Sequence, residues 1–256
     1  MIPGSEMAVV DANAAALGVP RKQLMESSGN AIARVVRDLA TPGDAVTVVC
    51  GRGNNGGDAA VAARFLDDFD LRILLLGRAE TITTDIAREN WAALQRGGYP
   101  TEEVRDSTAV DLGDPDLVVD AMLGTGISGD LREPAATAAA AMNDADATVL
   151  SVDVPSGLDA DDGTLAANAV APDHVVTFHD TKPGLEAIAA DVTVAEIGIP
   201  GAAEAFVERG DLQRLTRDPE SHKGDHGEVL VIGGGPYAGA PALAGQAALR
   251  AGADLV

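Results

Sequence analysis

Short runs of consecutive apolar residues, many of them β-branched, recur along the chain and alternate with longer stretches of helical character. The runs predicted to be strands are Ala45–Cys50, Leu71–Leu76, Leu117–Met122, Thr148–Asp153, His174–Phe178 and Val192–Ile197. The stretches predicted to be helices are Val9–Gly18, Arg21–Leu39, Asp58–Phe69, Thr84–Arg96 and Pro134–Asn143. Runs that are apolar at successive positions are typical of strands buried on both faces of a parallel sheet. The alternation therefore predicts a doubly wound α/β sheet with helices on both faces.

The pattern changes near Gly210–Glu220, a polar stretch that we interpret as a linker. After it we expect a strand at Glu228–Ile232, a glycine loop at Gly233–Gly235 and an Ala-rich helix reaching Arg250. One strand and one helix cannot bury a core of their own, so this tail is either the start of a second domain or an appendage of the first. The predicted division is a domain over residues 1–210, a linker over 211–221 and a domain fragment over 222–256.

The negative net charge of the chain excludes some classes of binding partner. The chain has 18 basic and 40 acidic residues, a net charge of −22, and only three lysines. Such a surface repels nucleic acid and anionic lipid, so we expect neither as a partner. Because the acidic residues are spread along the chain, we interpret them as a solvation device of a halophilic protein. A single cysteine, no leader pattern and no apolar run of about 18 residues favour a cytoplasmic protein.

The first candidate site is the sequence GRGNNGGD, Gly51–Asp58, which follows the first predicted strand. Glycines let a backbone approach a phosphate closely, and a following helix offers free N–H groups and a positive dipole end. Asn54 and Asn55 add amide groups that tolerate left-handed geometry. For Asp58, a role as helix N-cap is at least as well supported as a catalytic one.

Two further loops follow strands that we expect to lie in the same sheet. One contains Asp120, and the other contains Asp153 and Ser156 at a Pro-Gly turn. Ligands of such folds bind beyond the carboxyl ends of the strands, so Asn55, Asp120 and Ser156 fall within reach of one point. Their all-oxygen chemistry suits a hard monovalent or divalent cation rather than zinc. Asp153 is the best-placed carboxylate for acid–base chemistry.

One basic residue stands out. Lys182 follows another predicted strand in a chain that is poor in lysine. We leave open whether it belongs to the site or to the surface.

Six blocks in order resemble the NAD(P)H-hydrate epimerase family. They are LMESSG (Leu24–Gly29), GRGNNGGDAAVAARFL, VVDAMLGTGISG, SVDVPSGLDADDG, DHVVTFHDTKPG and EIGIP, and together they span roughly Met1 to Glu208. The resemblance implies an α/β fold, a Rossmann-like three-layer α/β/α sandwich with a mostly parallel sheet. It also implies epimerisation at C6 of the nicotinamide ring, which interconverts the R and S forms of hydrated NADH and NADPH, NAD(P)HX, as metabolite repair.

The same resemblance assigns roles to residues. The hydrated dinucleotide would be held by Asn54, Asn55, Gly56, Gly57 and Asp58, and by Gly124, Thr125, Gly126, Ile127, Ser128, Gly129 and Asp130. Asp153 would contact the reacting ring as the catalytic residue. One K⁺ per subunit would be bound by Asn55, Asp120 and Ser156. The family more often has glycine directly after NNGGD, whereas this chain has Ala59.

The tail resembles the opening of the ADP- or ATP-dependent NAD(P)H-hydrate dehydratase, a ribokinase-like domain, of which only the first strand and helix are present. It implies that a longer bifunctional protein would need ADP or ATP for that second activity.

Two alternatives stay open for the main domain. One is a non-catalytic binding module on the same fold. The other is an NAD-dependent dehydrogenase, against which the missing G-x-G-x-x-G pattern argues. A homo-oligomer is also left open.

Overall fold

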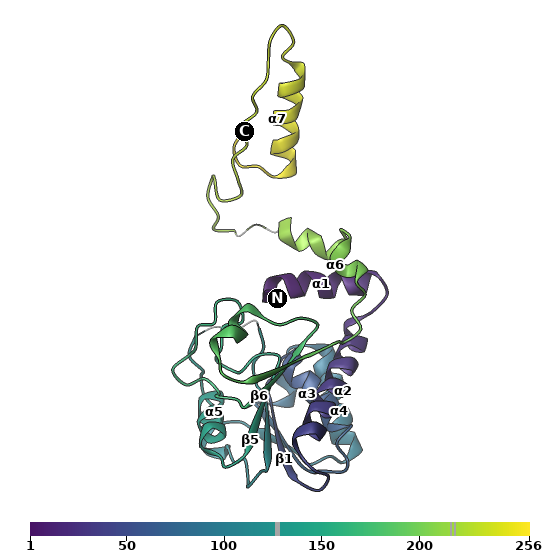
Figure 1. The fold of residues 1–256 in the computed structure, drawn as a ribbon, viewed down its shortest axis with the longest axis vertical. Helices are drawn as coiled ribbons and strands as arrows, with labels where there is room; N and C mark the ends of the chain where they lie inside the picture. Colours follow the sequence, from purple (N-terminus) through teal and green to yellow (C-terminus); the bar gives the residue numbers. More distant parts are fainter. Residues whose placement is uncertain (126–128, 216, 218) are drawn as a thin grey trace. The chain divides into compact units, whose positions relative to one another are not determined.

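The computed structural model describes residues 1–125, 129–215, 217 and 219–256. The chain divides into two compact units, Met1–Val207 and Glu208–Val256, both drawn in Figure 1. Each unit is described by itself.

The first unit contains a seven-stranded sheet. Its strands are β1 (Ala45–Cys50), β2 (Asp70–Leu76), β3 (Thr101–Val104), β4 (Leu117–Ala121), β5 (Thr148–Val152), β6 (His174–Phe178) and β7 (Asp191–Ala195). The order across the sheet is β3-β2-β1-β4-β5-β6-β7, and every neighbouring pair is parallel. The predicted Rossmann-like, mostly parallel sheet is confirmed.

Helices connect and cover these strands. The α-helices of the unit are α1 (Gly4–Ala16), α2 (Arg21–Leu39), α3 (Asn54–Ala63), α4 (Asp85–Gly97), α5 (Ala135–Asp144) and α6 (Ala202–Ala205). Short 3-10 helices are η1 (Ala79–Thr81), η2 (Ser107–Ala109) and η3 (Pro183–Ala187). Among the described residues, no helix has both the length and the apolar character that crossing a bilayer requires.

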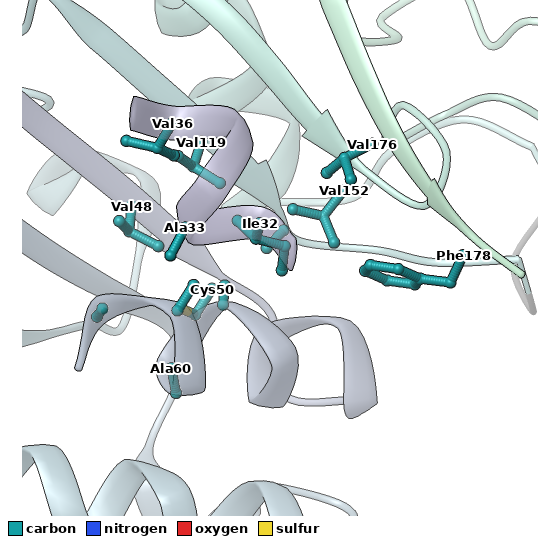
Figure 2. Packing of buried hydrophobic residues seen from close by; sticks show 14 of the residues in the cluster. Ile32, Ala33, Val36, Val48, Cys50, Ala60, Val119, Val152, Val176 and Phe178 are labelled. Atoms are coloured by element: carbon teal, nitrogen blue, oxygen red, sulfur yellow. The ribbon is translucent and has the colours of Figure 1, made fainter. Parts of the chain in front are cut away.

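Alternate residues of β1 pack into two separate hydrophobic cores, which explains why its apolar residues are consecutive. Val48 and Cys50 of β1 belong to the core cluster that also holds Ile32 of α2, as Figure 2 shows. Val49, between them, belongs to a second cluster with Met142 of α5. Because successive side chains of a strand point to opposite faces, both faces of the sheet are buried under helices.

Three element predictions of the first unit need correction. Helix α1 begins at Gly4 rather than at Val9. Strand β3 was not predicted, because its residues Thr101–Val104 are mostly polar and only Val104 is buried at this edge of the sheet. Helix α3 begins at Asn54 rather than at Asp58 and ends at Ala63 rather than at Phe69. The two asparagines and two glycines of NNGGD therefore form the first helical turn instead of a loop.

The glycines of that turn are required by packing. A Cβ atom on Gly56 would lie 2.1 Å from the carbonyl oxygen of Gly51, and one on Gly57 would lie 2.8 Å from the Ala87 side chain. Neither contact is possible for a larger residue without a backbone shift. From Asn54 onward, the segment predicted to be a phosphate-binding loop is the start of a helix that packs closely against its neighbours.

The second unit contains the 3-10 helix η4 (Arg209–Leu215), which overlaps the predicted linker, and α7 (Gly239–Ala251). The prediction of a strand at Glu228–Ile232 is wrong for the described residues, since they hold only an isolated bridge between Glu228 and Leu255. A strand needs a neighbour along its length. Leu230 and Ile232 are instead 83% and 87% exposed.

Candidate active site

A cavity of about 560 Å³ opens in the first unit beyond the carboxyl ends of the central strands. Residues that follow β1, β4 and β5 line it, as do Asp11 of α1 and Arg21 of α2. From β1 the strand order runs through β2 and β3 toward one edge of the sheet, and from β4 through β5, β6 and β7 toward the other. Such folds open a crevice for ligands at the point between β1 and β4 where the order changes. The predicted site residues that line the cavity are Asn54, Asn55, Asp58, Gly124, Thr125 and Asp153.

Asp153 directly follows β5 and has a left-handed backbone conformation, with φ of 66°. Its amide still donates to the carbonyl of Val176 in β6 at 2.7 Å, so the turn is fixed to the neighbouring strand. Non-glycine residues are uncommon in this region, although Asp and Asn tolerate it better than others. The turn points the Asp153 side chain, 18% exposed, into the cavity wall.

Lys182 is the partner of Asp153, which settles the question left open by the sequence. The lysine side chain is 1% exposed, and its Nζ lies 3.1 Å from Asp153 Oδ1. It also donates to Thr177 Oγ1 at 3.0 Å and to the carbonyls of Phe178 and Asp180 at 3.1 and 3.0 Å. A buried ammonium group needs such a set of acceptors. Lys182 belongs to the site and not to the surface.

Two further carboxylates face the same cavity as Asp153. Asp58 is the fifth residue of α3, so the interpretation as N-cap is wrong; Gly53 occupies that position. Burial, followed by the nearby Asp153 and Asp11 carboxylates, raises the pKa of Asp58 well above its ordinary range. Burial also raises the pKa of Asp11, against the lowering effect of Arg21. The cavity thus holds one carboxylate paired with a lysine and two that retain protons more readily than usual.

Asp120 lies beneath the cavity floor and is fully buried. Its Oδ1 accepts from Ser156 Oγ at 2.6 Å and from the Met122 amide at 3.2 Å. Its Oδ2 accepts from Ser151 Oγ and the Ser156 amide, each at 2.9 Å. Burial raises the pKa of Asp120, and hydrogen bonds, those of Ser156 foremost, lower it. Asp120 and Ser156, which the sequence predicts to lie close together, are in direct contact.

Asn55 reaches toward the same floor from α3. Its Nδ2 donates to the Leu123 carbonyl at 2.8 Å and to the Val152 carbonyl at 3.1 Å. The amide thus sits between the loops that follow β4 and β5. Asn55 and the two carbonyl groups lie on three segments that are far apart in the sequence and meet only in the folded sheet.

The remaining predicted residues are placed differently. Gly56 and Gly57 are buried behind the cavity wall. Gly129, with φ of 86°, and Asp130, whose Oδ1 accepts from the Ala167 amide at 3.3 Å, are not among the lining residues in the described part of the chain. Gly126, Ile127 and Ser128 lie outside the described residues. Asp11 and Arg21 were missed, since both lie on helices that precede the first strand.

Comparison with known proteins agrees with this architecture. The family model described as "YjeF-related protein N-terminus" matches residues 21–184. The chain belongs to this family. A yeast protein of known crystal structure, ynu0, is 24% identical and superposes with a TM-score of 0.63 over 87% of this chain and 96% of its own, which supports the YjeF-related fold.

Curated relatives of this YjeF-related chain carry names that concern hydrated nicotinamide dinucleotides. A protein of Methanothermobacter thermautotrophicus named bifunctional NAD(P)H-hydrate repair enzyme Nnr is 46% identical over 98% of this chain and 51% of its own length. A protein of the same name from Archaeoglobus fulgidus is 44% identical over 100% and 54%. The NAD(P)H-hydrate epimerase of Cenarchaeum symbiosum is 38% identical over 79% of this chain and 97% of its own. The chain spans about half the length of the bifunctional relatives.

The residues of this YjeF-related domain fit the cation that its sequence suggests. Asp120 is a buried carboxylate that accepts hydrogen bonds from hydroxyl and backbone amide groups, and no basic side chain of the described residues donates to it. The Ser156 hydroxyl contacts Asp120, and the carbonyl oxygens of Leu123 and Val152 contact Asn55 Nδ2. Oxygen donors with one negative charge suit a weakly charged hard cation better than a transition metal.

Proposed function

We propose that this chain is an NAD(P)H-hydrate epimerase, which interconverts the R and S forms of NAD(P)HX at C6 of the nicotinamide ring. The observation that carries the proposal is the Asp153–Lys182 pair at the wall of a dinucleotide-sized cavity, beside the protonatable Asp58. The names of the curated relatives support the same substrate class. The reaction belongs to the isomerases.

Inverting C6 by losing and regaining water needs one group that gives a proton and one that takes it. The C6–O bond breaks as the departing hydroxyl takes a proton and leaves as water, and the N1 lone pair forms an N1=C6 double bond. Water then adds to the opposite face and returns one proton to the protein. Asp58, with its raised pKa, gives the first proton in this scheme. Asp153, anchored by Lys182, orients the ring and accepts the proton that the incoming water loses.

A ring-opening route would break the N1–C6 bond instead of losing water. It would call on the same two carboxyl groups, because it also needs a proton donor and a proton acceptor at this position.

We also propose that Asn55, Asp120 and Ser156 hold one K⁺ per subunit. When bound, the ion supplies positive charge beneath the cavity, which offsets part of the phosphate charge that a chain of net charge −22 must admit. The support is the buried Asp120 carboxylate in contact with the Ser156 hydroxyl, together with the carbonyl oxygens of Leu123 and Val152 that Asn55 contacts. Asp120→Asn is expected to remove any stimulation of turnover by K⁺ over Na⁺ at equal ionic strength. K⁺ stimulation that persists unchanged in this variant would contradict the assignment.

The test of the main proposal uses pure S-NADHX and pure R-NADHX with the whole chain, followed by chromatography. Interconversion in both directions is expected. Asp153→Asn should abolish it while dinucleotide binding, measured by calorimetry, remains close to that of the unmodified chain. Absence of interconversion by the unmodified chain would favour a binding module, and oxidation of an alcohol with NAD would favour a dehydrogenase.

The finer assignments follow from the same proposal. Residues 1–210 form the epimerase domain, 211–221 the linker, and 222–256 the beginning of a ribokinase-like dehydratase domain that uses ADP or ATP. The shared length with the bifunctional relatives supports this division. A cytoplasmic, halophilic protein without nucleic-acid partners fits the acidic composition.

A further inference from the structure

Arg52 and Arg21 are basic residues of the cavity lining that the proposed chemistry at C6 does not use, and Arg52 is the one that follows a strand. It follows β1 and lies in the cavity wall with Gly53 and Asn54. Its carbonyl accepts from the amide of Thr83 at 2.8 Å and from Thr83 Oγ1 at 3.0 Å, so its backbone is fixed to the segment before α4. The backbone position from which the exposed side chain extends is therefore fixed.

The side chain of Arg52 extends toward the carboxyl end of β2. A Cβ atom built on Gly77, the residue directly after β2, would lie 2.8 Å from Cδ of Arg52. The Arg52 side chain thus passes over Gly77, in a space that exists because Gly77 has no side chain. Nη1 of Arg52 reaches Thr81 Oγ1 at 3.4 Å in η1.

Arg52 differs from the arginines around it in its partners. Neighbouring arginines are paired with carboxylates: Arg78 with Glu80 at 3.5 Å, Arg88 with Asp85 at 2.7 Å and Arg105 with Glu103 at 3.0 Å. In the described part of the chain, no ion pair joins Arg52 to an acidic side chain. Its guanidinium group is available to an anion.

The N-terminal ends of two helices lie beside this arginine. Asn54, at the start of α3, accepts a hydrogen bond through Oδ1 from Thr84 Oγ1 at 2.8 Å, and Thr84 caps α4. Each helix end contributes a partial positive charge. Arg52, Asn54 and Thr84 all line the cavity, so these charges face one side of it.

The position of this cluster on the sheet relates it to one end of the substrate. A dinucleotide lies across the carboxyl ends of the strands, with one mononucleotide over each half of the sheet. The proposed reacting ring lies at Asp153, after β5, and the strand order from there runs β5-β4-β1-β2. At about 4.8 Å per strand, β2 lies roughly 14 Å away. The adenosine half then reaches β2, where dinucleotide folds bind the ribose 2′-position with an acid for NAD or an arginine for NADP.

We infer that Arg52, laid over Gly77 at the end of β2, binds the adenosine 2′-phosphate and makes NADPHX the preferred substrate over NADHX. The inference rests on the proposed epimerase function for its substrate. Arg52 is a specificity residue in this account and takes no part in the chemistry at C6. A guanidinium group suits this task because it presents several donors to phosphate oxygens.

The experiment compares kcat/KM for NADPHX and for NADHX in the whole chain. Arg52→Met should lower the NADPHX/NADHX ratio about 10- to 100-fold, the range expected when a charge-assisted hydrogen bond is lost. Arg52→Lys should retain part of the preference, because it keeps the charge but not the fork. The matched control is Arg96→Ala, an exposed arginine in the last turn of α4, which should leave the ratio unchanged.

A binding measurement separates this inference from the epimerase proposal. Calorimetry should show that adenosine 2′,5′-bisphosphate binds more tightly than AMP, and that Arg52→Met removes the difference. Two results would overturn the assignment. An equal fall in kcat/KM for both substrates would mean that Arg52 binds a phosphate common to both, and unchanged kcat/KM values would mean that Arg52 does not contact the substrate. If the unmodified chain interconverts neither substrate, the epimerase proposal fails. The preference for adenosine 2′,5′-bisphosphate still decides the role of Arg52.

Discussion

Replacing Lys182 with methionine should both destabilise the protein and stop epimerisation. The Lys182 ammonium group contacts Asp153, Thr177 and the carbonyls of Phe178 and Asp180. Methionine fills much of the same space and donates nothing, so the Asp153 carboxylate loses its counter-charge. Breaking a buried pair by removing one partner costs about 3–5 kcal/mol. Because the Asp153 side chain is 18% exposed, water solvates it in part, and we expect about 3 kcal/mol.

Urea unfolding followed by the fluorescence of Trp91 measures this cost, since Trp91 is the single tryptophan and is 2% exposed. For a domain of this size the melting temperature should fall by roughly 6–12 °C. The control Lys22→Met removes an exposed pair with Glu89, at 2.6 Å with both side chains 59% exposed, and should cost less than about 1 kcal/mol.

A double variant tests whether the energy belongs to the pair. Asparagine tolerates the left-handed conformation of Asp153, so Asp153→Asn removes the charge with the backbone kept. Lys182→Met combined with Asp153→Asn should be less destabilised than the sum of the single changes by at least about 1 kcal/mol. Strict additivity within about 0.5 kcal/mol would refute the reasoning.

Gly56→Ala should destabilise the protein by about 1–3 kcal/mol in urea unfolding, because the added Cβ meets the Gly51 carbonyl. The control Gly53→Ala should not, because a Cβ at Gly53 has no atom within 4 Å. Equal effects of the two changes would contradict the packing argument. The raised pKa of Asp58 means that its contribution to stability is complete below the ordinary value of 3.8 and is lost as the pH rises through the folded pKa. Asp58→Asn should therefore raise the unfolding free energy at neutral pH and flatten its pH dependence, and an unchanged pH profile would argue against it. With a net charge of −22, both NaCl and KCl should raise the melting temperature, and a steady fall with salt would contradict the halophilic interpretation.

The pattern of apolar runs determined the sheet, because strands buried on both faces leave consecutive apolar residues in the sequence. The runs at Ala45–Cys50 and His174–Phe178 match β1 and β6 residue for residue. Strand β3 left no such trace, since an edge strand buries little and its residues Thr101–Val104 are mostly polar. The opposite case is Glu228–Ile232. This run is apolar, but in the described residues it forms no strand, because its pairing is limited to the isolated bridge between Glu228 and Leu255.

The candidate site, too, could be predicted from the sequence only in part. The sequence indicated Asp120, Asp153 and Ser156 as candidate site residues, because acidic and hydroxyl residues at strand ends stand out against apolar runs. It did not determine that Lys182 is buried against Asp153, that Asp11 shares the cavity or that Asp58 lies within a helix. Those facts depend on parallel strands that bring distant loops to one edge, and on burial, which changes the charge of a carboxyl group without changing the sequence around it.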